Sequence, residues 1–387
     1  MDNTTILISG AGIAGPALGC LLRAYGFGVT VVEKAPAPRP GGQAVDFKGE
    51  THLSVLRSMG ILADVRRMRT GGADQEIVDA GGRRLAVMPG EFTGGDVEIR
   101  RGDLSRLLYD RSSAAGCEYV FGDSLTSLTE TADGVHVTFE RGAPRTFGLV
   151  VGADGIHSNV RGLAFGPERD HVRHLGHYYA LAELPESVGD VPRMYNEPGR
   201  MVAAGGPKGP AFFVFASPEL SYDRYDTEAM KRVVIDAYAG MGWRTPEILE
   251  QVRRAEDLYL DSISQVRVDH YAKGRVVLLG DTAYGNTLGG FGTGLAVVGA
   301  YVLAGELAMA GGDHQAAFRR YEELLRPYAK IARNGNAGPF LAPGTPGRIR
   351  MRNRIFKSRL LLKGMLKMTD MFATGITLPD YPSPARR

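Results

Sequence analysis

Residues 5–15, TILISGAGIAG, decide the fold, because an apolar strand runs directly into glycines spaced G-x-G-x-x-G. In such a turn Gly10 permits the sharp bend, Gly12 lets the backbone approach a pyrophosphate, and Gly15 lets the next helix pack on the strand. The free N–H groups and the positive end of that helix would face the phosphates. The motif is weak by itself, so its surroundings decide what it means.

The residues after the turn complete a βαβ unit. Pro16 suits the start of a helix, apolar residues recur at helical spacing up to Tyr25, and residues 29–33 form a second apolar strand that ends in Glu33. A carboxylate at that place binds a ribose in dinucleotide folds. A chance glycine turn is the alternative, but strand, helix and acid agree. We therefore expect dinucleotide binding, with an unphosphorylated adenosine ribose as in FAD or NAD.

The composition is that of an ordinary enzyme. The 387 residues favour two domains, and a net charge of +3 is too weak to indicate nucleic acid as a partner. Cys20 and Cys117 are the only cysteines, which excludes a disulfide framework and a CxxC redox centre. The opening MDNTT lacks the basic segment of a signal peptide, and no run of about 18 apolar residues is free of charge. We expect a cytoplasmic monomer or weak dimer without a membrane span.

Short strand signals without intervening helices fill the middle of the chain. Residues 194–195, 201–204 and 212–215 have the pattern of strands of one sheet, whereas the βαβ signals lie at the two ends. This order predicts an α/β fold with interleaved domains. The predicted division assigns residues 1–77, 98–175 and 268–330 to a Rossmann-like nucleotide-binding domain, 78–97 and 176–267 to a β-sheet substrate domain, and 331–387 to a C-terminal helical segment.

Three further motifs lie far from the glycine turn. Residues 149–161, LVVGADGIHSNVR, are a strand followed by a D-G-x-x-S-x-x-R element. Residues 274–307 hold a strand that ends in Gly280-Asp281, a glycine-rich loop and a long apolar helix. Residues 98–104, EIRRGDL, place Arg101 just before a helix that Asp103 would cap.

Together these motifs resemble the single-component FAD-dependent aromatic hydroxylases, the p-hydroxybenzoate hydroxylase-like class A monooxygenases. The short chain, and the Gly41-Gly42 pair before Val45-Asp46, are most similar to the tetracycline-inactivating branch and its actinobacterial relatives. The likeness covers nearly the whole chain and is weakest at residues 165–265. It implies a Rossmann-like FAD-binding domain, an interleaved substrate domain and a C-terminal helix that bridges the two.

The resemblance also implies roles for the motif residues. Asp281 corresponds to an aspartate that accepts a ribityl hydroxyl of FAD, Arg101 to an arginine at the ribityl–phosphate region, and Asp154 to an aspartate between the flavin and nicotinamide sites. Surface salt bridging is the alternative for Arg101, and helix capping for Asp154. The start of the long helix would stabilise the negative charge of the reduced flavin. The full set of expected FAD contacts is Gly10, Gly12, Ile13, Ala14, Gly15, Glu33, Lys34, Arg101, Leu125, Asp154, Asp281, Gly292, Thr293 and Gly294.

The chemistry that the family likeness implies is oxygenation with tightly but non-covalently bound FAD. NAD(P)H would reduce the flavin, O2 would form a C4a-hydroperoxide, and one oxygen would pass to an aromatic or polycyclic, polyketide- or tetracycline-like molecule. The likeness leaves open whether this serves antibiotic biosynthesis or resistance. No second G-x-G-x-x-G opens a helix after a strand, which fits a nicotinamide that docks only briefly.

Other activities stay open on the same scaffold. Epoxidation or Baeyer–Villiger oxygenation would use the same cofactor. A flavin-dependent halogenase is a weaker alternative, since its W-x-W-x-I-P element has no counterpart around Trp243, the single tryptophan. The last alternative is a flavoprotein that binds FAD without catalysing a reaction.

The mid-chain sheet is expected to form the floor of the substrate pocket. Phe213 and Phe215 alternate on one strand face and would stack an aromatic ring, with core packing as an equal alternative. Arg200 aligns with a pocket arginine of the tetracycline-inactivating branch and would pair with an acidic or enolate substrate, unless it lies on a solvated turn. Tyr179 and Thr287 complete the expected substrate contacts, and no residue is assigned as a catalytic acid or base.

This chain departs from the family pattern near the expected flavin ring. Relatives usually carry prolines in the loop after the G-D motif, where this chain has Asn286 and Thr287. Gly294 stands where an asparagine is often found. These changes concern the shape of the oxygen-activation pocket and not FAD binding.

Two remaining features have simpler explanations. His171, His174 and His177 are close in sequence, but no carboxylate or cysteine stands nearby at ligand spacing, so we expect no metal. His157 is expected to point outward. The segment 347–368 has eight basic residues and no acid, which suits a membrane-surface helix or, as the family likeness favours, a bridging helix with a wet basic face.

Overall fold

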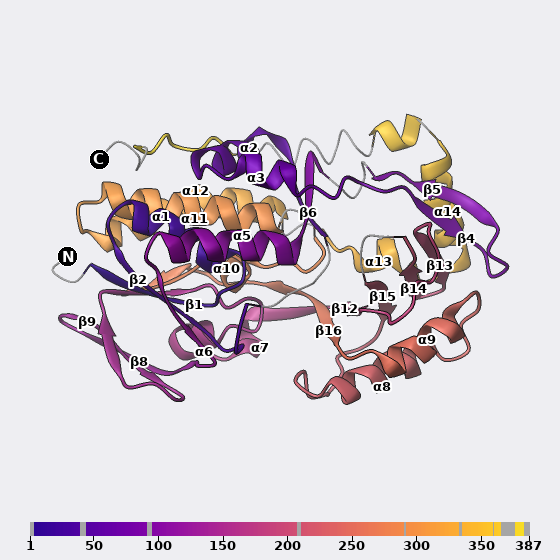
Figure 1. Cartoon of the computed structure of the whole chain (residues 1–387), viewed down its shortest axis with the longest axis horizontal. Helices are drawn as coiled ribbons and strands as arrows, with labels where there is room; N and C mark the ends of the chain where they lie inside the picture. The colour runs from indigo at the N-terminus through magenta and orange to yellow at the C-terminus, as the bar shows by residue number, and fades with distance from the viewer. Residues whose placement is uncertain are drawn as a thin grey trace.

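The structure is a computed structural model of the whole chain, and it describes residues 4–38, 44–90, 95–206, 210–289, 292–332, 335–358, 360–364 and 376–382. The Gly41-Gly42 pair lies outside the described residues. The fold is mixed α/β, as predicted, with two large sheets that lie at opposite ends of the molecule (Figure 1).

The first large sheet carries the glycine turn. Its strand order is β17-β18-β11-β1-β2-β7, and all neighbours are parallel except β17 and β18. Ile8 pairs with Val31 on one side and Val151 on the other, so β1 lies where the chain order changes direction. Dinucleotides bind at such a switch point in open parallel sheets. The strands are β1 (Thr5–Ser9), β2 (Gly28–Glu33), β7 (Glu118–Phe121), β11 (Leu149–Gly152), β17 (Ala272–Lys273) and β18 (Val276–Leu278).

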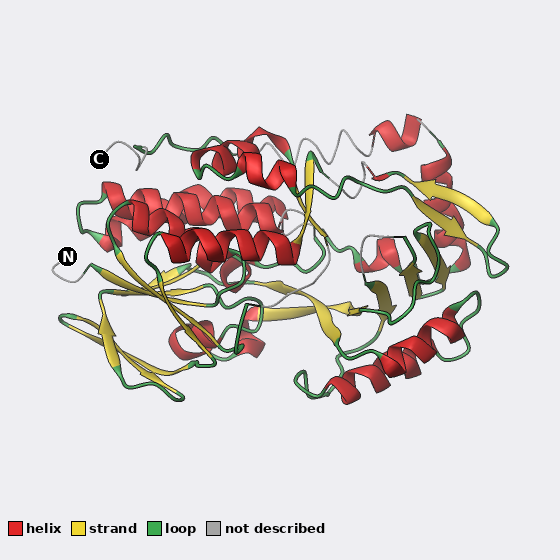
Figure 2. Cartoon of the chain, viewed as in Figure 1, coloured by secondary structure: helices red, strands yellow, loops and turns green. Residues whose placement is uncertain are grey.

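Both faces of this sheet are covered, which explains why its strands are apolar throughout. Helices lie together on one face and a three-stranded sheet lies on the other (Figure 2). The helices are α1 (Ala14–Ala24), α5 (Arg101–Ala114), α11 (Gly292–Met309) and α12 (His314–Ala332), and the small sheet comprises β8 (Leu125–Thr131), β9 (Gly134–Phe139) and β10 (Arg145–Phe147).

Helix α11 is apolar all round because it lies between α1, α12 and α2 (Gly49–Ser58). Within the described part of the chain it is the one helix long and apolar enough to cross a membrane, with a mean hydropathy of 1.4. Since 67% of it is buried inside the protein, core packing accounts for its composition.

The second large sheet has the order β16-β12-β15-β14-β13-β4-β5, and only β13 and β4 are parallel. Helices α8 (Thr227–Tyr238) and α9 (Thr245–Arg254) cover one face, and α13 (Gly338–Leu341) and α14 (Pro346–Lys357) pack on the other. The strands are β4 (Gln75–Val78), β5 (Arg84–Met88), β12 (Val172–Ala182), β13 (Arg193–Glu197), β14 (Arg200–Ala204), β15 (Ala211–Ala216) and β16 (Leu258–Val266).

Short elements connect the two large sheets. Strands β4 and β12 begin a few residues before the predicted boundaries at 78 and 176, and the domain division itself stays a prediction. The connecting elements are β3 (Ala44–Phe47), α3 (Leu62–Arg67), β6 (Val97–Arg100), α6 (Asn159–Phe165), α7 (Glu168–His171) and α10 (Asp281–Tyr284).

The C-terminal segment contacts both halves of the molecule. Phe356 of α14 is buried against the second sheet. Residues 376–382 return to the first half, where the Tyr381 ring lies against Gly305 of α11 and Tyr25 Oη donates to the carbonyl of Pro382 at 3.1 Å. Two separate parts of this segment, α14 and residues 376–382, therefore contact the two halves of the molecule that the segment was predicted to bridge.

Candidate active site

The glycine turn has the geometry that its motif predicts. Gly10 has a φ of +107°, and a Cβ there would lie 2.4 Å from the carbonyl oxygen of Ala153. A Cβ on Gly15 would lie 2.0 Å from the carbonyl oxygen of Gly10. At Gly12 the nearest atom to such a Cβ is Arg101 Nη2, at 3.9 Å. The turn is thus tightly packed behind and open in front, on the side of Arg101.

The Glu33 carboxylate braces this turn against the end of β2. Its Oε2 accepts from the Ala11 N–H at 2.8 Å, and its Oε1 accepts from the Ala35 N–H at 2.9 Å. Each carboxylate oxygen can accept a second hydrogen bond. Glu33 is therefore held rigidly with lone pairs to spare, as the predicted contact with a ribose requires.

Residues from three distant segments meet beside the turn. Helix α5 begins at Arg101, two residues before Asp103, so Asp103 lies in the first turn and does not cap the helix. Burial raises the pKa of Asp281, and the charge of Arg101 opposes that shift. Asp281 Oδ1 lies 3.8 Å from the place of a Cβ on Gly292, at the start of α11. The Asp281 side chain is solvent-exposed although its carboxylate is desolvated, as expected for a carboxylate inside a recess.

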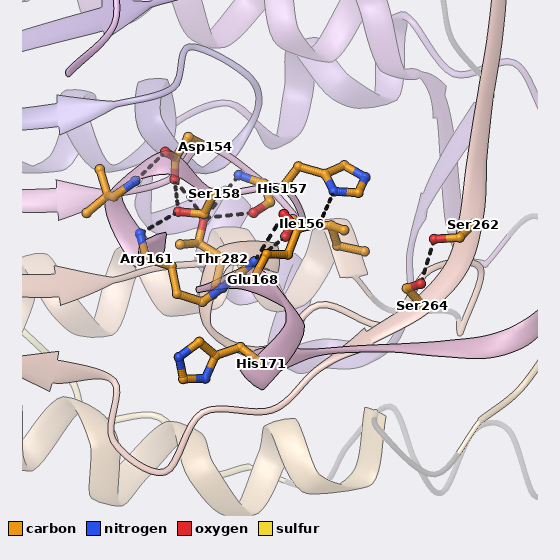
Figure 3. Close-up of polar contacts among 12 residues, drawn as sticks. Asp154, Ile156, His157, Ser158, Arg161, Glu168, His171, Ser262, Ser264 and Thr282 are labelled. Atoms are coloured by element: carbon orange, nitrogen blue, oxygen red, sulfur yellow. Dashed lines mark hydrogen bonds and ion pairs between the residues drawn. The ribbon is translucent and has the colours of Figure 1, made fainter. Parts of the chain in front are cut away.

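Asp154 joins the carboxyl ends of three adjacent strands, and Figure 3 shows its contacts with Ser158 and Thr282. Its Oδ1 accepts from Ser158 Oγ at 2.5 Å and from Thr282 Oγ1 at 3.3 Å. Its Oδ2 accepts from the Val160 N–H at 3.1 Å and from Ser9 Oγ at 3.4 Å. Burial raises its pKa, and these hydrogen bonds oppose the shift. The contact with Val160, in the first turn of α6, is the capping role that was the alternative for Asp154.

Arg161, the last residue of the same motif, is fully buried. It donates to the carbonyl oxygens of Thr282 at 3.0 Å and Ile156 at 2.5 Å (Figure 3). The serine and arginine of the D-G-x-x-S-x-x-R element therefore hold the turn in place, since Ser158 also caps α6 by accepting from the Arg161 N–H at 2.9 Å.

The first turn of α11 packs directly on His52 of α2. A Cβ on Gly294 would lie 2.2 Å from His52 Cε1. The ring is buried, and this burial lowers its pKa to about 4, so it is neutral. Its Nδ1 accepts from the Lys48 N–H at 3.1 Å, which leaves Nε2–H to donate to Tyr328 Oη at 2.9 Å. The His52 ring thus occupies the space that a side chain at position 294 would need.

The loop between α10 and α11 is attached to the second sheet. The Val266 N–H donates to the Gly285 carbonyl at 2.8 Å, and the Thr287 N–H donates to the Ser264 carbonyl at 2.9 Å. Leu288 has a φ of +56°, a strained conformation for this residue type, and packs against the α13 side of the second sheet. Thr287 Oγ1 is buried and finds no partner in the described part of the chain. Such a hydroxyl is available to a ligand.

Tyr179 lies on the α13 side of the second sheet, together with Phe212. Burial raises its pKa, and the charges of Arg101 and Asp281 also act on it. The side of the sheet that carries Tyr179 is therefore within electrostatic reach of the residues around the glycine turn.

Phe213 and Phe215 lie on the opposite side, in the core beneath α8. Their relative exposures are 0% and 3%, and both rings contact Tyr238 edge-on, with centroids 5.1 and 6.0 Å apart. These are the contacts of core residues, the alternative given above. We do not include the two phenylalanines in the substrate site.

Arg200 pairs in register with Phe215, so its side chain lies on the α8 side as well. It forms an ion pair with Glu197 at 2.6 Å and donates to the carbonyls of Ala237 and Ala239 at 3.3 and 3.1 Å. These contacts place Arg200 at the C-terminal end of α8, away from Tyr179. The expected pairing with an acidic substrate is not supported by this position.

The other expected contacts lie around the first sheet. Ile13 and Ala14 are buried at the start of α1, and Leu125 is buried at the start of β8. Lys34 is exposed, with its Nζ 4.6 Å from the centre of the Tyr225 ring. Their roles toward FAD stay predictions, as do those of Gly292 and Thr293.

His157 does not point outward, contrary to expectation. Its Nδ1 lies 2.9 Å from Glu168 Oε1, and its Nε2 lies 3.0 Å from Asp261 Oδ1. Asp261 belongs to β16, 104 residues away, and shares its side of the sheet with Tyr259. Glu168, Asp261 and Tyr259 were not singled out from the sequence. The alternation in LYLDSISQV does place Tyr259, Asp261 and Ile263 on one face of the strand.

The three neighbouring histidines bind backbone carbonyls and do not converge. His171 contacts Phe165 O at 3.2 Å, His174 contacts Ser217 O at 2.9 Å, and His177 contacts Leu175 O at 3.4 Å. Among the residues with described placement, no three His, Cys, Asp or Glu side chains are arranged to hold a metal ion.

The sequence profile of the FAD binding domain family matches residues 3–333. The chain belongs to this family. A flavin-dependent monooxygenase of Legionella longbeachae is 35% identical over 393 residues, which cover 98% of this chain and 99% of that protein. The tetracycline destructases Tet(51) and Tet(55) have similar structures, with TM-scores of 0.83 and 0.82, identities of 31% and 34%, and coverage of 97% and 98% of this chain and 99% of each of theirs.

This chain is thus an FAD-dependent monooxygenase, and the site fits that cofactor. The open front of Gly12 admits a diphosphate, and Arg101 supplies a cation beside it. No described residue donates a hydrogen bond to the desolvated Asp281 carboxylate, which a ribityl hydroxyl would do. The predicted family resemblance is confirmed, including the likeness to the tetracycline-inactivating branch.

Proposed function

We propose that this FAD-dependent monooxygenase uses NAD(P)H and O2 to hydroxylate an aromatic or polycyclic, polyketide- or tetracycline-like small molecule. The observation that carries the proposal is that the loop after Asp281 is hydrogen-bonded to β16 through the Val266 and Thr287 N–H groups, which joins the flavin site to the sheet that carries Tyr179. The structural likeness to two tetracycline destructases supports the same substrate class. We further propose that the enzyme acts in the cytoplasm as a monomer or weak dimer.

In this proposal FAD lies along the line from Glu33 to Gly294. Glu33 binds the adenosine ribose, and the N–H groups after Gly12 bind the diphosphate beside Arg101. Asp281 would accept a hydrogen bond from a ribityl hydroxyl, and the dipole at the start of α11 would favour negative charge on the flavin ring. The bound cofactor would supply the redox chemistry with NAD(P)H and O2.

The protein's part in oxygen transfer is to exclude water and orient the substrate. The α13 side of the second sheet provides an apolar wall that includes the partly buried Leu175, Phe212 and Phe340. Leu288 extends this wall from the loop before α11. Apolar side chains with a few polar groups among them are typical of sites for large ring systems, so such a ring system is the expected occupant.

Two polar groups would orient such a ring system. Thr287 Oγ1 is buried without a partner in the described structure, and the hydroxyl of Tyr179 lies on the neighbouring sheet. A substrate with oxygen substituents would satisfy Thr287, which otherwise carries the cost of a lost hydrogen bond. Tetracyclines and aromatic polyketides have many such substituents.

The test is a screen of tetracyclines and aromatic polyketides for stimulation of NAD(P)H oxidation, followed by the mass of the product. Release of hydrogen peroxide without an oxygenated product, for every compound, would contradict the proposal. Hydroxylation and ring expansion both add one oxygen atom, so the mass does not separate them. NMR of the product distinguishes a new hydroxyl on a carbon from an oxygen inserted into a ring. The variant T287V should raise KM, whereas the matched T227V, at the start of α8, should not.

A further inference from the structure

A chain of polar side chains connects the D-G turn of the FAD-binding half with the second sheet. His157 lies in that turn, with a ring nitrogen 2.9 Å from Glu168 and the other 3.0 Å from Asp261. Ionised carboxylates only accept hydrogen bonds, so both ring nitrogens must carry protons. His157 is therefore an imidazolium held between two anions, and these hydrogen bonds, opposed by burial, raise its pKa to about 9.

Asp261 also accepts a hydrogen bond from Tyr259, which extends the chain of polar side chains. The Tyr259 hydroxyl donates to Asp261 Oδ2 at 2.8 Å. A phenol has one proton, so the Tyr259 oxygen can only accept further hydrogen bonds. The Tyr259 ring also contacts the ring of Tyr179, with centroids 5.6 Å apart.

The Tyr259 end of this chain lies on the side of the second sheet that carries Tyr179 and Leu181. Tyr259 is 41% exposed, so a ligand on that side of the sheet can reach it. Tyr179 is 7% exposed and interacts electrostatically with Arg101 and Asp281 of the flavin site. Tyr259 thus shares the side of the sheet on which the proposed function places the substrate.

We propose that His157 is a positioning residue, which fixes Asp261 and thereby presents Tyr259 as a hydrogen-bond acceptor for a hydroxyl of the substrate. The inference rests on the proposed function and narrows it: the enzyme selects polycyclic phenols or enols over analogues without a hydroxyl donor. An analogue that lacks the donor covers the Tyr259 oxygen without satisfying it, and such a mismatch gives strong discrimination.

The test measures binding to the FAD-loaded enzyme of two probes, alizarin and its dimethyl ether, 1,2-dimethoxyanthraquinone. The wild type should bind alizarin at least about tenfold more tightly than the ether. Y259F and H157Q should reduce this ratio to near one. The matched control is Y222F, whose hydroxyl donates to the Leu260 carbonyl at 3.1 Å and takes no part in the chain; it should keep the wild-type ratio.

The outcomes separate the inference from its alternatives. Equal binding of both probes by the wild type, no binding of either, or an unchanged ratio in H157Q would overturn it. A rise in the KM for NAD(P)H alone in H157Q would assign His157 to the nicotinamide instead and would also overturn it. A selective ratio without ligand-stimulated NAD(P)H oxidation would support the inference and count against the proposed function.

Discussion

The substitution G294A tests the packing of the flavin-facing helix most sharply. In the structure a Cβ at this position would lie 2.2 Å from His52 Cε1 and 2.5 Å from both ring nitrogens. Ordinary contacts begin near 3.4 Å, so ring and helix must separate by about 1 Å. The ring cannot simply turn aside, because the Lys48 N–H and Tyr328 Oη hold its two nitrogens.

The expected cost follows from overpacking in a buried site. Forcing one extra methyl into such a core costs about 1–3 kcal/mol, and the rigid ring places this case at about 2 kcal/mol. Movement of the first turn of α11 should also weaken FAD binding about tenfold, since each 1.4 kcal/mol is a factor of ten. The assays are urea unfolding of the apoprotein and fluorescence titration of apoprotein with FAD.

A double-mutant cycle identifies His52 as the cause. In H52A the space beside Gly294 opens, so adding G294A should cost about 2 kcal/mol less than it costs in the wild type. The matched control is G162A in α6, where a Cβ meets nothing within 4 Å; it should be neutral or stabilising by up to about 1 kcal/mol. Strictly additive costs of H52A and G294A, or a G294A variant as stable as the wild type, would refute the reasoning.

Three further predictions concern charged groups. D281A should weaken FAD binding at least about tenfold without lowering the stability of the apoprotein, because the ionised carboxylate is desolvated there; an apoprotein melting point well below that of the wild type would contradict this. R200M should leave KM for the substrate unchanged but lower the free energy of unfolding by about 1–2 kcal/mol, since the Ala237 and Ala239 carbonyls lose a charged donor, and steady-state kinetics with urea unfolding would check both. Because the pKa of His157 is raised to about 9 from 6.5, its contribution to stability is complete below pH 6.5 and is lost as the pH rises through 9. Between those values the wild type should lose on the order of 1–3 kcal/mol more than H157Q, and parallel curves would show that the imidazolium contributes nothing.

The parts of the fold that could be predicted are those fixed by local patterns. The glycine turn, its strand and the acid that follows depend on residues within one βαβ unit, and β1 (Thr5–Ser9) is the apolar strand expected directly before the turn. The motifs and their order along the chain were sufficient to predict the family. Each motif encodes a particular turn conformation and can therefore be recognised from local sequence. Gly10 and Gly15 have neighbours that exclude any side chain.

What could not be predicted depends on contacts between distant segments. Alternation places Phe213 and Phe215 on one face, but it does not say that α8 covers that face. The same holds for Arg200, which the register puts beside Phe215. His157 finds its partner 104 residues away on β16, and no local pattern encodes that pairing.

The departure at Gly294 shows how a structure resolves an apparent anomaly. The missing side chain is compensated by His52, from a helix that neither the family motifs nor the periodicity singled out. Sequence comparison at one position cannot detect such a compensation, because it involves two residues far apart in the chain. The structure makes it visible as a close packing contact.

The central claim is that a single FAD site, built from the two ends of the chain, activates O2 beside the Tyr179 face of the second sheet. The most direct measurement is turnover of a stimulating polycyclic phenol under ¹⁸O2, with NAD(P)H, by enzyme whose bound FAD has been quantified. The account predicts one FAD per chain and a product that carries one ¹⁸O atom from the gas. A colourless protein that takes up no FAD, or a product whose new oxygen comes only from water, would contradict it.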